Sequence, residues 1–336
     1  MRDKLAAAEG DYPRPPGVDP EALLTVVRIP REWARWRIDR VVVATFPRMS
    51  RTRAQGVIRI GAFAPDGRKL RSGARVRFDD VVLLYRPPFE EADVPLECPV
   101  LYEDERLLAI DKPPGLPVHP TARWHHHTVV KVLEKARPHD KLALCHRIDR
   151  ETSGVLLLAK DRDAERFVKR ALEARGIVEK RYLALTVGLP PWEEARITHA
   201  MMLDERHRLR VKMRLADPAE AGALDAATRF RVVRRHPSGR YGWVTCDLET
   251  GRQHQIRVHL AAEGAPLVGD KLYGPDDELF ARGADGTLTA EDLVRLEHPR
   301  HALHAERLIL PHPSDPNTRV TITAPPPADL LAFWGS

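Results

Sequence analysis

Apolar and polar positions follow four different patterns along the chain. Residues 1–29 hold several prolines and little apolar periodicity, which predicts a flexible arm. Residues 30–88 combine a helical pattern with short alternating runs, as in a small α/β module. Residues 89–97 lose periodicity and gain prolines, which is typical of a linker. In residues 98–330, apolar runs alternate with turns and helical patterns, which predicts an α+β domain with a largely antiparallel sheet.

Three segments have the apolar period of a helix. The first covers residues 50–61, where Ser50 can cap the start and Gly61 suits the end. Its apolar stripe, at spacings of three and four, consists of Ala54, Val57 and Ile58. The other two patterns lie at 128–135 and 163–175. These segments predict one helix in the first module and at least two in the second.

The segment 145–160, CHRIDRETSGVLLLAK, places a charged loop between two apolar runs. The runs at 142–145 and 155–159 predict buried strands, so the loop would project from the rim of a rigid sheet. Catalytic groups favour that setting, because a rigid scaffold positions them. The polar side chains of the loop are His146, Arg147, Asp149, Arg150, Thr152 and Ser153.

The positive charge of the chain is concentrated in the first module. The chain has 336 residues and a net charge of +6, and an average domain holds about 100 to 200 residues. Residues 30–86 contain 14 Lys or Arg against 5 Asp or Glu, a net +9 that leaves −3 for the rest. Such a module favours a polyanion partner, most simply RNA, because cationic side chains bind phosphates. A solvated basic face is the alternative.

Cysteine usage and apolar run lengths limit the class of protein. Cys98, Cys145 and Cys246 are widely separated, so neither a disulfide framework nor a zinc knuckle is indicated. The three histidines at 125–127 are adjacent, and adjacent side chains diverge, so we expect no metal. No signal-peptide core and no run near the roughly 20 apolar residues of a membrane span is present. We expect a monomer in a reducing cytoplasm, with no membrane partner.

Five segments carry a resemblance to a known family. HRIDRETSG, residues 146–154, resembles the HRLDxxTSG motif of the RluA-type pseudouridine synthases, with Ile148 in place of leucine. The other segments match in the family's order, over roughly residues 97 to 325. They are YEDERLLAIDKPPGLPVHP (102–120), KRYLALTVG (180–188), TGRQHQIRVHL (250–260) followed by GAPLVGDKLYG, and RHALHAERLILPHP (300–313). Residues 35–86 resemble the alpha-L RNA-binding motif more loosely.

The resemblance implies the pseudouridine synthase fold and the isomerisation of uridines in structured RNA. Large-subunit ribosomal RNA is the first substrate that the family implies, and transfer RNA is the second. The target base would have to be flipped out of its stack, which costs a few kcal/mol. No cofactor is expected, because the isomerisation needs neither a redox change nor an external group donor.

The resemblance also assigns roles to four residues. Asp149 would be the reacting carboxylate, either at the sugar or at the ring, and both routes stay open. Arg257 would form an ion pair that keeps Asp149 ionised against the effect of burial. Tyr182 would stack on uracil or relay a proton, and Arg147 would fill the gap left by the flipped base. Thr152, with its neighbours Ser153 and Gly154, would support the loop.

Other assignments are less specific. Lys112 and Gly115 are expected to define a turn beside the site, and residues 275–298 resemble an insertion that would serve as a lid or an extra RNA contact. A non-catalytic RNA-binding assembly factor on the same fold is the alternative function, and a DNA-acting or nucleotide-level enzyme is a third. The presence of Asp149, Tyr182 and Arg257 argues against the non-catalytic alternative. The side chains expected to contact RNA are Arg147, His146, Arg150, Arg252, His254, Gln255, Arg51 and Arg53.

Overall fold

The computed structural model consists of two compact units, Met1–Glu91 and Ala92–Ser336. The residues that it describes are 12–20, 22–46, 49–87, 91–121 and 124–335. Of the expected linker, residues 91–97 form neither helix nor strand. Within the described ranges, no helix has the length and apolar character needed to cross a membrane.

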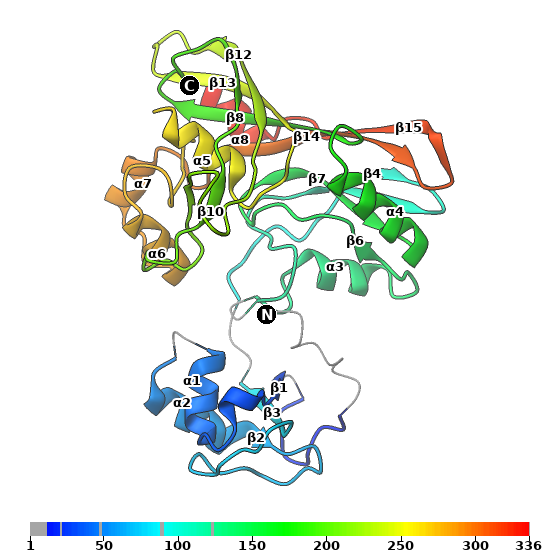
Figure 1. Cartoon of the computed structure of the whole chain (residues 1–336), viewed down its shortest axis with the longest axis vertical. Coiled ribbons are helices and arrows are strands. Elements are labelled where there is room, and N and C mark those ends of the chain that lie inside the picture. Colours follow the sequence, from blue (N-terminus) through cyan, green and yellow to red (C-terminus); the bar gives the residue numbers. More distant parts are fainter. Residues whose placement is uncertain (1–11, 21, 47–48, 88–90, 122–123, 336) are drawn as a thin grey trace. The chain divides into compact units, whose positions relative to one another are not determined.

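The N-terminal unit packs two helices against a three-stranded antiparallel sheet in the order β1-β3-β2 (Figure 1). Its elements are β1 (Leu23–Arg28), a 3-10 turn (Arg31–Trp33), α1 (Ile38–Thr45), α2 (Arg51–Gly61), β2 (Ala62–Phe63) and β3 (Val81–Arg86). The flexible arm predicted over 1–29 is wrong from residue 23, because β1 pairs with β3 along its whole length and Val27 is buried. The first eleven residues of that arm lie outside the described part of the chain.

The helix predicted at residues 50–61 is present as α2. The Ser50 hydroxyl accepts a hydrogen bond from the Arg53 N–H at 3.2 Å, which caps the helix. Ala54 and Ile58 are fully buried, so the predicted apolar stripe faces the core. Gly61 ends the helix for a different reason from the expected one. A Cβ at this position would lie 1.8 Å from the Tyr85 carbonyl oxygen, so β3 leaves no room for a side chain.

The C-terminal unit is built on a large mixed sheet with strand order β4-β5-β7-β14-β8-β13-β12-β9; β6 also pairs with β7, and β15 with β14. Every pairing is antiparallel except that of β7 with β14, which confirms the prediction of a largely antiparallel sheet. The strands are β4 (Val100–Glu103), β5 (Leu107–Lys112), β6 (Ala143–Leu144), β7 (Ser153–Ala159), β8 (Glu179–Val187), β9 (Glu194–Ile197), β12 (Thr228–Arg235), β13 (Tyr241–Leu248), β14 (Leu303–His312) and β15 (Asp315–Thr323). A separate hairpin consists of β10 (Met201–Leu203) and β11 (Met213–Leu215).

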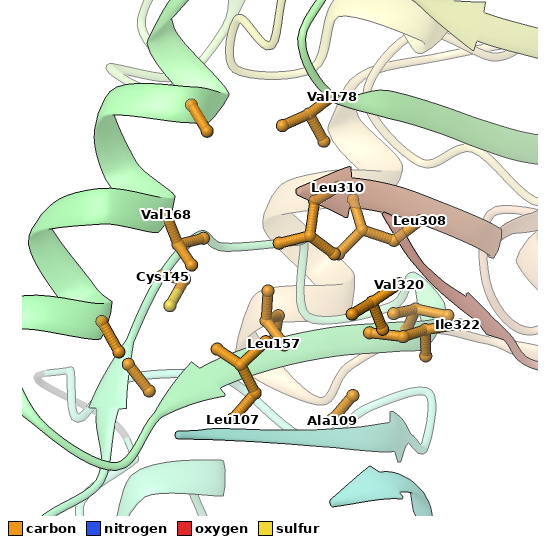
Figure 2. Close-up of a cluster of buried hydrophobic side chains, with 14 of the residues drawn as sticks. Leu107, Ala109, Cys145, Leu157, Val168, Val178, Leu308, Leu310, Val320 and Ile322 are labelled. Atoms are coloured by element: carbon orange, nitrogen blue, oxygen red, sulfur yellow. The ribbon is translucent and has the colours of Figure 1, made fainter. Parts of the chain in front are cut away.

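Six helices accompany these strands in the part of the unit that the structure describes. They are α3 (Val129–Ala136), α4 (Arg162–Glu173), α5 (Gln255–Ala262), α6 (Glu278–Asp285), α7 (Ala290–Leu296) and α8 (Ala328–Gly335). The helices predicted at 128–135 and 163–175 are therefore present as α3 and α4. Figure 2 shows Val168 of α4 beside Cys145, on the side of the helix that faces Leu157 and Leu310 of the sheet. This cluster holds α4 on one face of the sheet by burial of apolar surface.

The parallel pairing of β7 with β14 brings distant segments together at the middle of the sheet. It aligns Ser153 with His304 and Gly154 with Ala305. Gly154 has a φ of +104°, and a Cβ there would lie 2.2 Å from the Ala305 carbonyl oxygen. Glycine is therefore required at this position, both for its conformation and for the close approach of β14. The loop that precedes β7 is fixed by this contact.

The expected insertion at residues 275–298 contains α6 and α7. Thr289 caps the start of α7 in a capping box, in which its hydroxyl accepts from the Asp292 N–H and the Asp292 carboxylate accepts from the Thr289 N–H. Asp277 ties the segment to the β10–β11 hairpin, because its carboxylate binds Arg208 at 2.9 Å and Lys212 at 2.5 Å. The segment is thus anchored to the unit by ion pairs.

Candidate active site

Asp149 lies in the loop between β6 and β7, and the backbone around it is firmly held. The Thr152 N–H donates to the Asp149 carbonyl oxygen at 3.1 Å. One residue further, the Arg150 carbonyl accepts from the Gly115 N–H and from the Lys112 Nζ, both at 2.9 Å. The expected turn of Lys112 and Gly115 is therefore present, and its two hydrogen bonds to the Arg150 carbonyl hold the loop that carries Asp149.

Lys112 is a buried cation bonded only to carbonyl oxygens in the described part of the chain. Its side chain is fully buried, and its Nζ donates to the carbonyls of Pro113, Leu116 and Arg150 at 2.7 to 2.9 Å. Burial lowers the pKa of Lys112 to about 7, since the charged form loses hydration. The three carbonyl acceptors use all three N–H donors of the ammonium group. Lys112 therefore connects its own motif segment, residues 102–120, to the segment 146–154 that contains Arg150.

Arg257 of α5 binds two carboxylates at once. Its Nη1 donates to Oδ2 of Asp149 at 2.9 Å, which is the ion pair expected from the resemblance. Its Nε and Nη2 donate to Asp270 at 2.7 and 2.8 Å in a bidentate pair. Asp270 also accepts the backbone N–H groups of Leu272 and Tyr273. Because Asp270 is fully buried and holds the guanidinium on two atoms, Arg257 has one orientation in which to meet Asp149.

The charges around Asp149 keep it ionised. Burial raises the pKa of this carboxyl, but cationic neighbours outweigh burial and lower it to about 2. His254 contributes only when protonated, and burial lowers its own pKa to about 4. At neutral pH, the Arg257 guanidinium is therefore the cation that keeps Asp149 negative. The cluster of Asp149, Arg257 and Asp270 carries a net negative charge, because one arginine serves two carboxylates.

Tyr182 stands on β8 beside this pair. The register of β8 places it opposite Cys246 of β13 and Ala305 of β14, next to the parallel β7–β14 junction. Burial and the negative charge of Asp149 raise the pKa of its hydroxyl, so the tyrosine is neutral. Its ring packs partly against the core and partly lines the same pocket as Asp149.

A pocket of about 180 Å³ opens over these residues. Its wall includes the predicted catalytic side chains Asp149, Tyr182 and Arg257. Of the predicted RNA-contacting residues, Arg147, Arg252, His254 and Gln255 also line it. Arg147 is exposed, and within the described ranges no carboxylate lies at ion-pair distance from it. The structure thus brings together three motif segments that are far apart in sequence.

Two of the residues expected to contact RNA point inward instead. His146 is half-buried, and its Nε2 accepts the N–H of Leu157 at 3.1 Å. Gln255 is 2% exposed, and its amide makes four hydrogen bonds to the protein. No polar atom of the Gln255 amide remains for RNA. We correct the assignment of Gln255, whose amide instead holds the loops of the site in place. An RNA contact of His146 stays a prediction.

Arg150 and Arg252 retain partial exposure. The Arg150 guanidinium pairs with Glu151 at 3.1 Å and lies 5.7 Å from the centre of the Trp124 ring. Arg252 donates from its Nε to the Asp225 carbonyl at 2.9 Å. His254 faces Asp149 and is bonded to Tyr273. Arg150 and Arg252 thus keep exposed guanidinium surface, whereas His254 is largely buried inside the pocket.

Sequence reasoning missed a second layer of buried charge under the loop. Lys271 donates to both carboxylate oxygens of Glu151, at 2.9 and 3.0 Å. Arg300 donates to the Glu151 carbonyl oxygen and forms a bidentate pair with Asp329 of α8. Asp270 and Lys271 lie in the motif segment GAPLVGDKLYG, and Arg300 begins the segment RHALHAERLILPHP. Their burial could not be predicted, because a charged residue after an apolar run is usually exposed.

The N-terminal unit has its own concave surface, a cleft of about 400 Å³ lined mostly by arginines. Arg40 lies with its guanidinium 3.9 Å from the centre of the Trp36 ring, a cation–π contact. Arg51 lines the cleft, whereas Arg53 is exposed elsewhere on α2. The lining residues are Arg35, Trp36, Arg37, Arg40, Val43, Arg51 and Arg75.

Comparisons with known proteins agree with this geometry. Residues 106–262 match the family model for RNA pseudouridylate synthase. The chain is 37% identical over 312 residues to a ribosomal large subunit pseudouridine synthase D from Xanthomonas campestris, covering 90% of this chain and 89% of the relative. The chain belongs to the RNA pseudouridylate synthase family. The corresponding protein of Pseudomonas aeruginosa is 34% identical, covering 90% of this chain and 92% of its own.

Solved structures extend the likeness to the fold. The human RNA pseudouridylate synthase domain containing 4 is 26% identical with a TM-score of 0.54, covering 70% of this chain and 91% of its own. The human RNA pseudouridylate synthase domain containing 1 is 25% identical with a TM-score of 0.55, covering 73% of this chain and 91% of its own. The predicted pseudouridine synthase fold and RluA-type family are therefore confirmed. The protein is an isomerase that acts on RNA.

Proposed function

We propose that this synthase isomerises uridines of large-subunit ribosomal RNA, with transfer RNA as the second substrate class. Three relatives, with 37, 34 and 31% identity, are named ribosomal large subunit pseudouridine synthase D, which supports the first class. Such a substrate also agrees with the expected cytoplasmic monomer. The observation that carries the chemistry is an ionised Asp149 in a pocket beside Tyr182, with one oxygen held by Arg257.

Asp149 is the reacting group in this proposal. In the reaction, the bond between C1′ of the ribose and N1 of uracil breaks. A bond between C1′ and C5 forms, the C5 hydrogen leaves, and N1 gains a hydrogen. The carboxylate acts either at C1′ of the sugar or at the ring, and both routes need it ionised. Arg257 supports that state, and the neutral Tyr182 is suited to stack on uracil and to relay a proton.

The N-terminal unit is the proposed RNA-docking domain. Its arginine-lined cleft combines guanidinium groups with the ring of Trp36, which suits phosphates and a stacked base. Arg51 and Arg53 supply further positive charge on α2. Arg147 and Arg252 at the pocket rim would receive the flanking nucleotides, with Arg147 filling the gap left by the flipped uridine.

The decisive experiment is pseudouridine mapping on unmodified transcripts of ribosomal and transfer RNA. Carbodiimide treatment and primer extension locate each new pseudouridine after incubation with wild-type protein. The matched variants are Asp149→Asn and Asp163→Asn, since Asp163 is an exposed carboxylate on α4. We expect sites in large-subunit RNA with wild type and with Asp163→Asn, and none with Asp149→Asn.

Any of three outcomes would count against the proposal. New sites made equally by Asp149→Asn would remove that residue from the chemistry. Sites in transfer RNA alone would replace the substrate class and leave the reaction in place. If transcripts of both classes stay unmodified, assembly intermediates of the large subunit are tested next, and their failure too would favour a non-catalytic assembly factor.

The docking role has a separate test in the salt dependence of RNA binding. Replacing Arg35, Arg40 and Arg75 by glutamine removes three cations from the cleft. We expect the slope of log affinity against log salt to fall by about 0.7 to 0.9 for each phosphate that the cleft no longer neutralises. The control replaces Arg162, Arg166 and Arg170 of α4, which changes the net charge by the same amount. Equal slopes for the two triple variants would remove the docking role from the cleft.

A further inference from the structure

His254 stands at the N-terminus of α5 in an unusual backbone conformation. Its φ of 58° and ψ of 16° lie in the left-handed region, which residues other than glycine seldom adopt. Its side chain is 9% exposed and lines the pocket of Asp149. The imidazole ring is therefore directed into the site by a backbone conformation that the surrounding structure must hold.

A short chain of hydrogen bonds determines which ring nitrogen carries the proton. The Met213 N–H donates to the Tyr273 hydroxyl oxygen at 2.8 Å. That oxygen lies 2.8 Å from Nδ1 of His254. A phenol has one proton to donate, and among the described residues Nδ1 is the one acceptor found for it. Nδ1 thus accepts, and a neutral ring must carry its hydrogen on Nε2.

The protonated nitrogen faces the reacting carboxylate. Nε2 of His254 lies 3.9 Å from Oδ1 of Asp149, whereas Arg257 holds Oδ2. The two carboxylate oxygens therefore have different surroundings, one bound by a guanidinium and one beside a neutral N–H group. Burial lowers the pKa of His254 to about 4, so the ring is uncharged at neutral pH.

We propose that His254, held by Tyr273 as the Nε2–H tautomer, is a positioning residue that hydrogen-bonds Oδ1 of Asp149 when the nucleotide is bound. The separation of 3.9 Å is longer than a hydrogen bond, and such bonds in unoccupied active sites commonly shorten on substrate binding. A neutral donor orients Oδ1 without adding a positive charge at hydrogen-bond distance from that oxygen. The hydrogen bonds from Met213 to Tyr273 and from Tyr273 to His254 then keep the proton of the ring on Nε2, which faces Asp149.

The tautomer can be measured without any activity assay. In protein labelled with ¹⁵N-histidine, long-range proton–nitrogen spectra at pH 7 separate protonated from unprotonated ring nitrogens, and His254→Gln identifies the signals of His254. We expect a protonated Nε2 and an unprotonated Nδ1. Tyr273→Phe should convert these signals to those of a mixed tautomer. Tyr241→Phe, whose lost hydroxyl donates to Glu297, should leave them unchanged. A protonated Nδ1 in the wild type would overturn the proposal.

The positioning role rests on the proposed function and has its own kinetic test. His254→Asn suits the left-handed backbone and places its amide near Nδ1, so it loses the donor toward Asp149. His254→Gln extends its amide toward the position of Nε2. We expect His254→Asn to lower kcat by about a hundredfold with KM nearly unchanged, and His254→Gln to recover much of that loss. Equal losses in kcat for the two variants would overturn the role.

The two levels of inference fail in different ways. If wild-type protein makes no pseudouridine, the proposed function fails, while the nitrogen spectra still decide the tautomer. If pseudouridine forms and the spectra show a protonated Nδ1, the function stands and the role of His254 is overturned. RNA affinity of His254→Asn, measured in parallel, should match the wild type, because Nε2 faces Asp149 and not the rim. A loss of affinity equal to the loss of kcat would also overturn it.

Discussion

Asp39 in the N-terminal unit and Asp149 in the C-terminal unit are both carboxylates held by arginine. Asp39 is fully buried, and its two oxygens accept from Arg37, Arg51 and Gln55 at 3.0 to 3.2 Å. Asp149 is 24% exposed, and Arg257 holds only its Oδ2. In both cases burial raises the pKa, and the neighbouring donors bring it down to about 2.

The comparison teaches that a lowered pKa does not distinguish a structural carboxylate from a reactive one. The oxygens of Asp39 are all engaged, so its negative charge organises the arginines around α1 and α2. Asp149 keeps Oδ1 directed into a pocket, at 3.9 Å from a neutral imidazole. The difference is that Oδ1 of Asp149 accepts no hydrogen bond from the described residues. That depends on the position of the side chain and not on its ionisation.

Asp149→Asn should have the largest effect on turnover. An amide cannot replace a reacting carboxylate, so we expect release of tritium from RNA labelled at C5 of uridine to slow by at least about a thousandfold. RNA affinity should stay close to wild type, because the loop is held by other groups. A parallel fall in affinity would mean that Asp149 organises the fold, as Asp39 is expected to do.

Arg257→Gln should disrupt both function and folding. Asp270 then loses its partner while buried, at a cost of about 3–5 kcal/mol in unfolding free energy. Without the Arg257 charge, burial raises the pKa of Asp149. The acid side of the profile of kcat/KM against pH (its acid limb) therefore moves to higher pH. Arg257→Lys keeps the charge and should move that limb less, although it loses the bidentate pair. An unchanged limb in both variants would remove Arg257 from the ionisation of Asp149.

Asp39→Asn should affect stability without affecting the chemistry. The buried amide satisfies its arginine neighbours less well, which should cost about 1–3 kcal/mol. Hydrogen exchange followed by mass spectrometry should show faster exchange in residues 23–86 only. Isomerisation of a minimal RNA that the pocket alone can bind should keep the wild-type rate. A slowed rate on that RNA would contradict the division of roles between the two carboxylates.

The smallest expected effect is on acid stability. Both carboxyls have a folded-state pKa of about 2, below the value of about 3.9 in unfolded chains. Their stabilisation is therefore complete above pH 4 and lost as the pH falls through about 2. Asp39→Asn and Asp149→Asn should each reduce the slope of unfolding free energy against pH in that window, by the equivalent of up to one bound proton. Urea unfolding at a series of pH values measures this slope. Asp163→Asn serves as the control.

Local periodicity predicted much of the fold. Ser50 caps α2, and its stripe of Ala54 and Ile58 is buried, as expected from spacing alone. The boundary at residue 29 was wrong because β1 has its partner in β3, more than fifty positions away. Gly61 was assigned to a helix end for its conformation, whereas β3 requires its size. Both errors concern contacts that no short window of sequence contains.

The sequence alone determined the candidate chemistry: the motif segments, and within them Asp149, Tyr182 and Arg257. Tertiary structure decided how those residues act. Asp149 and Arg257 are 108 positions apart, and their contact exists because β7 and β14 pair and α5 packs beside them. Packing also decides that His146 and Gln255 point inward and that Asp270 pairs with Arg257. It likewise leaves Oδ1 of Asp149 without a hydrogen bond from any residue that the structure describes. Sequence records residue types and their spacing, whereas burial and hydrogen-bond partners arise only when distant segments close around a common core.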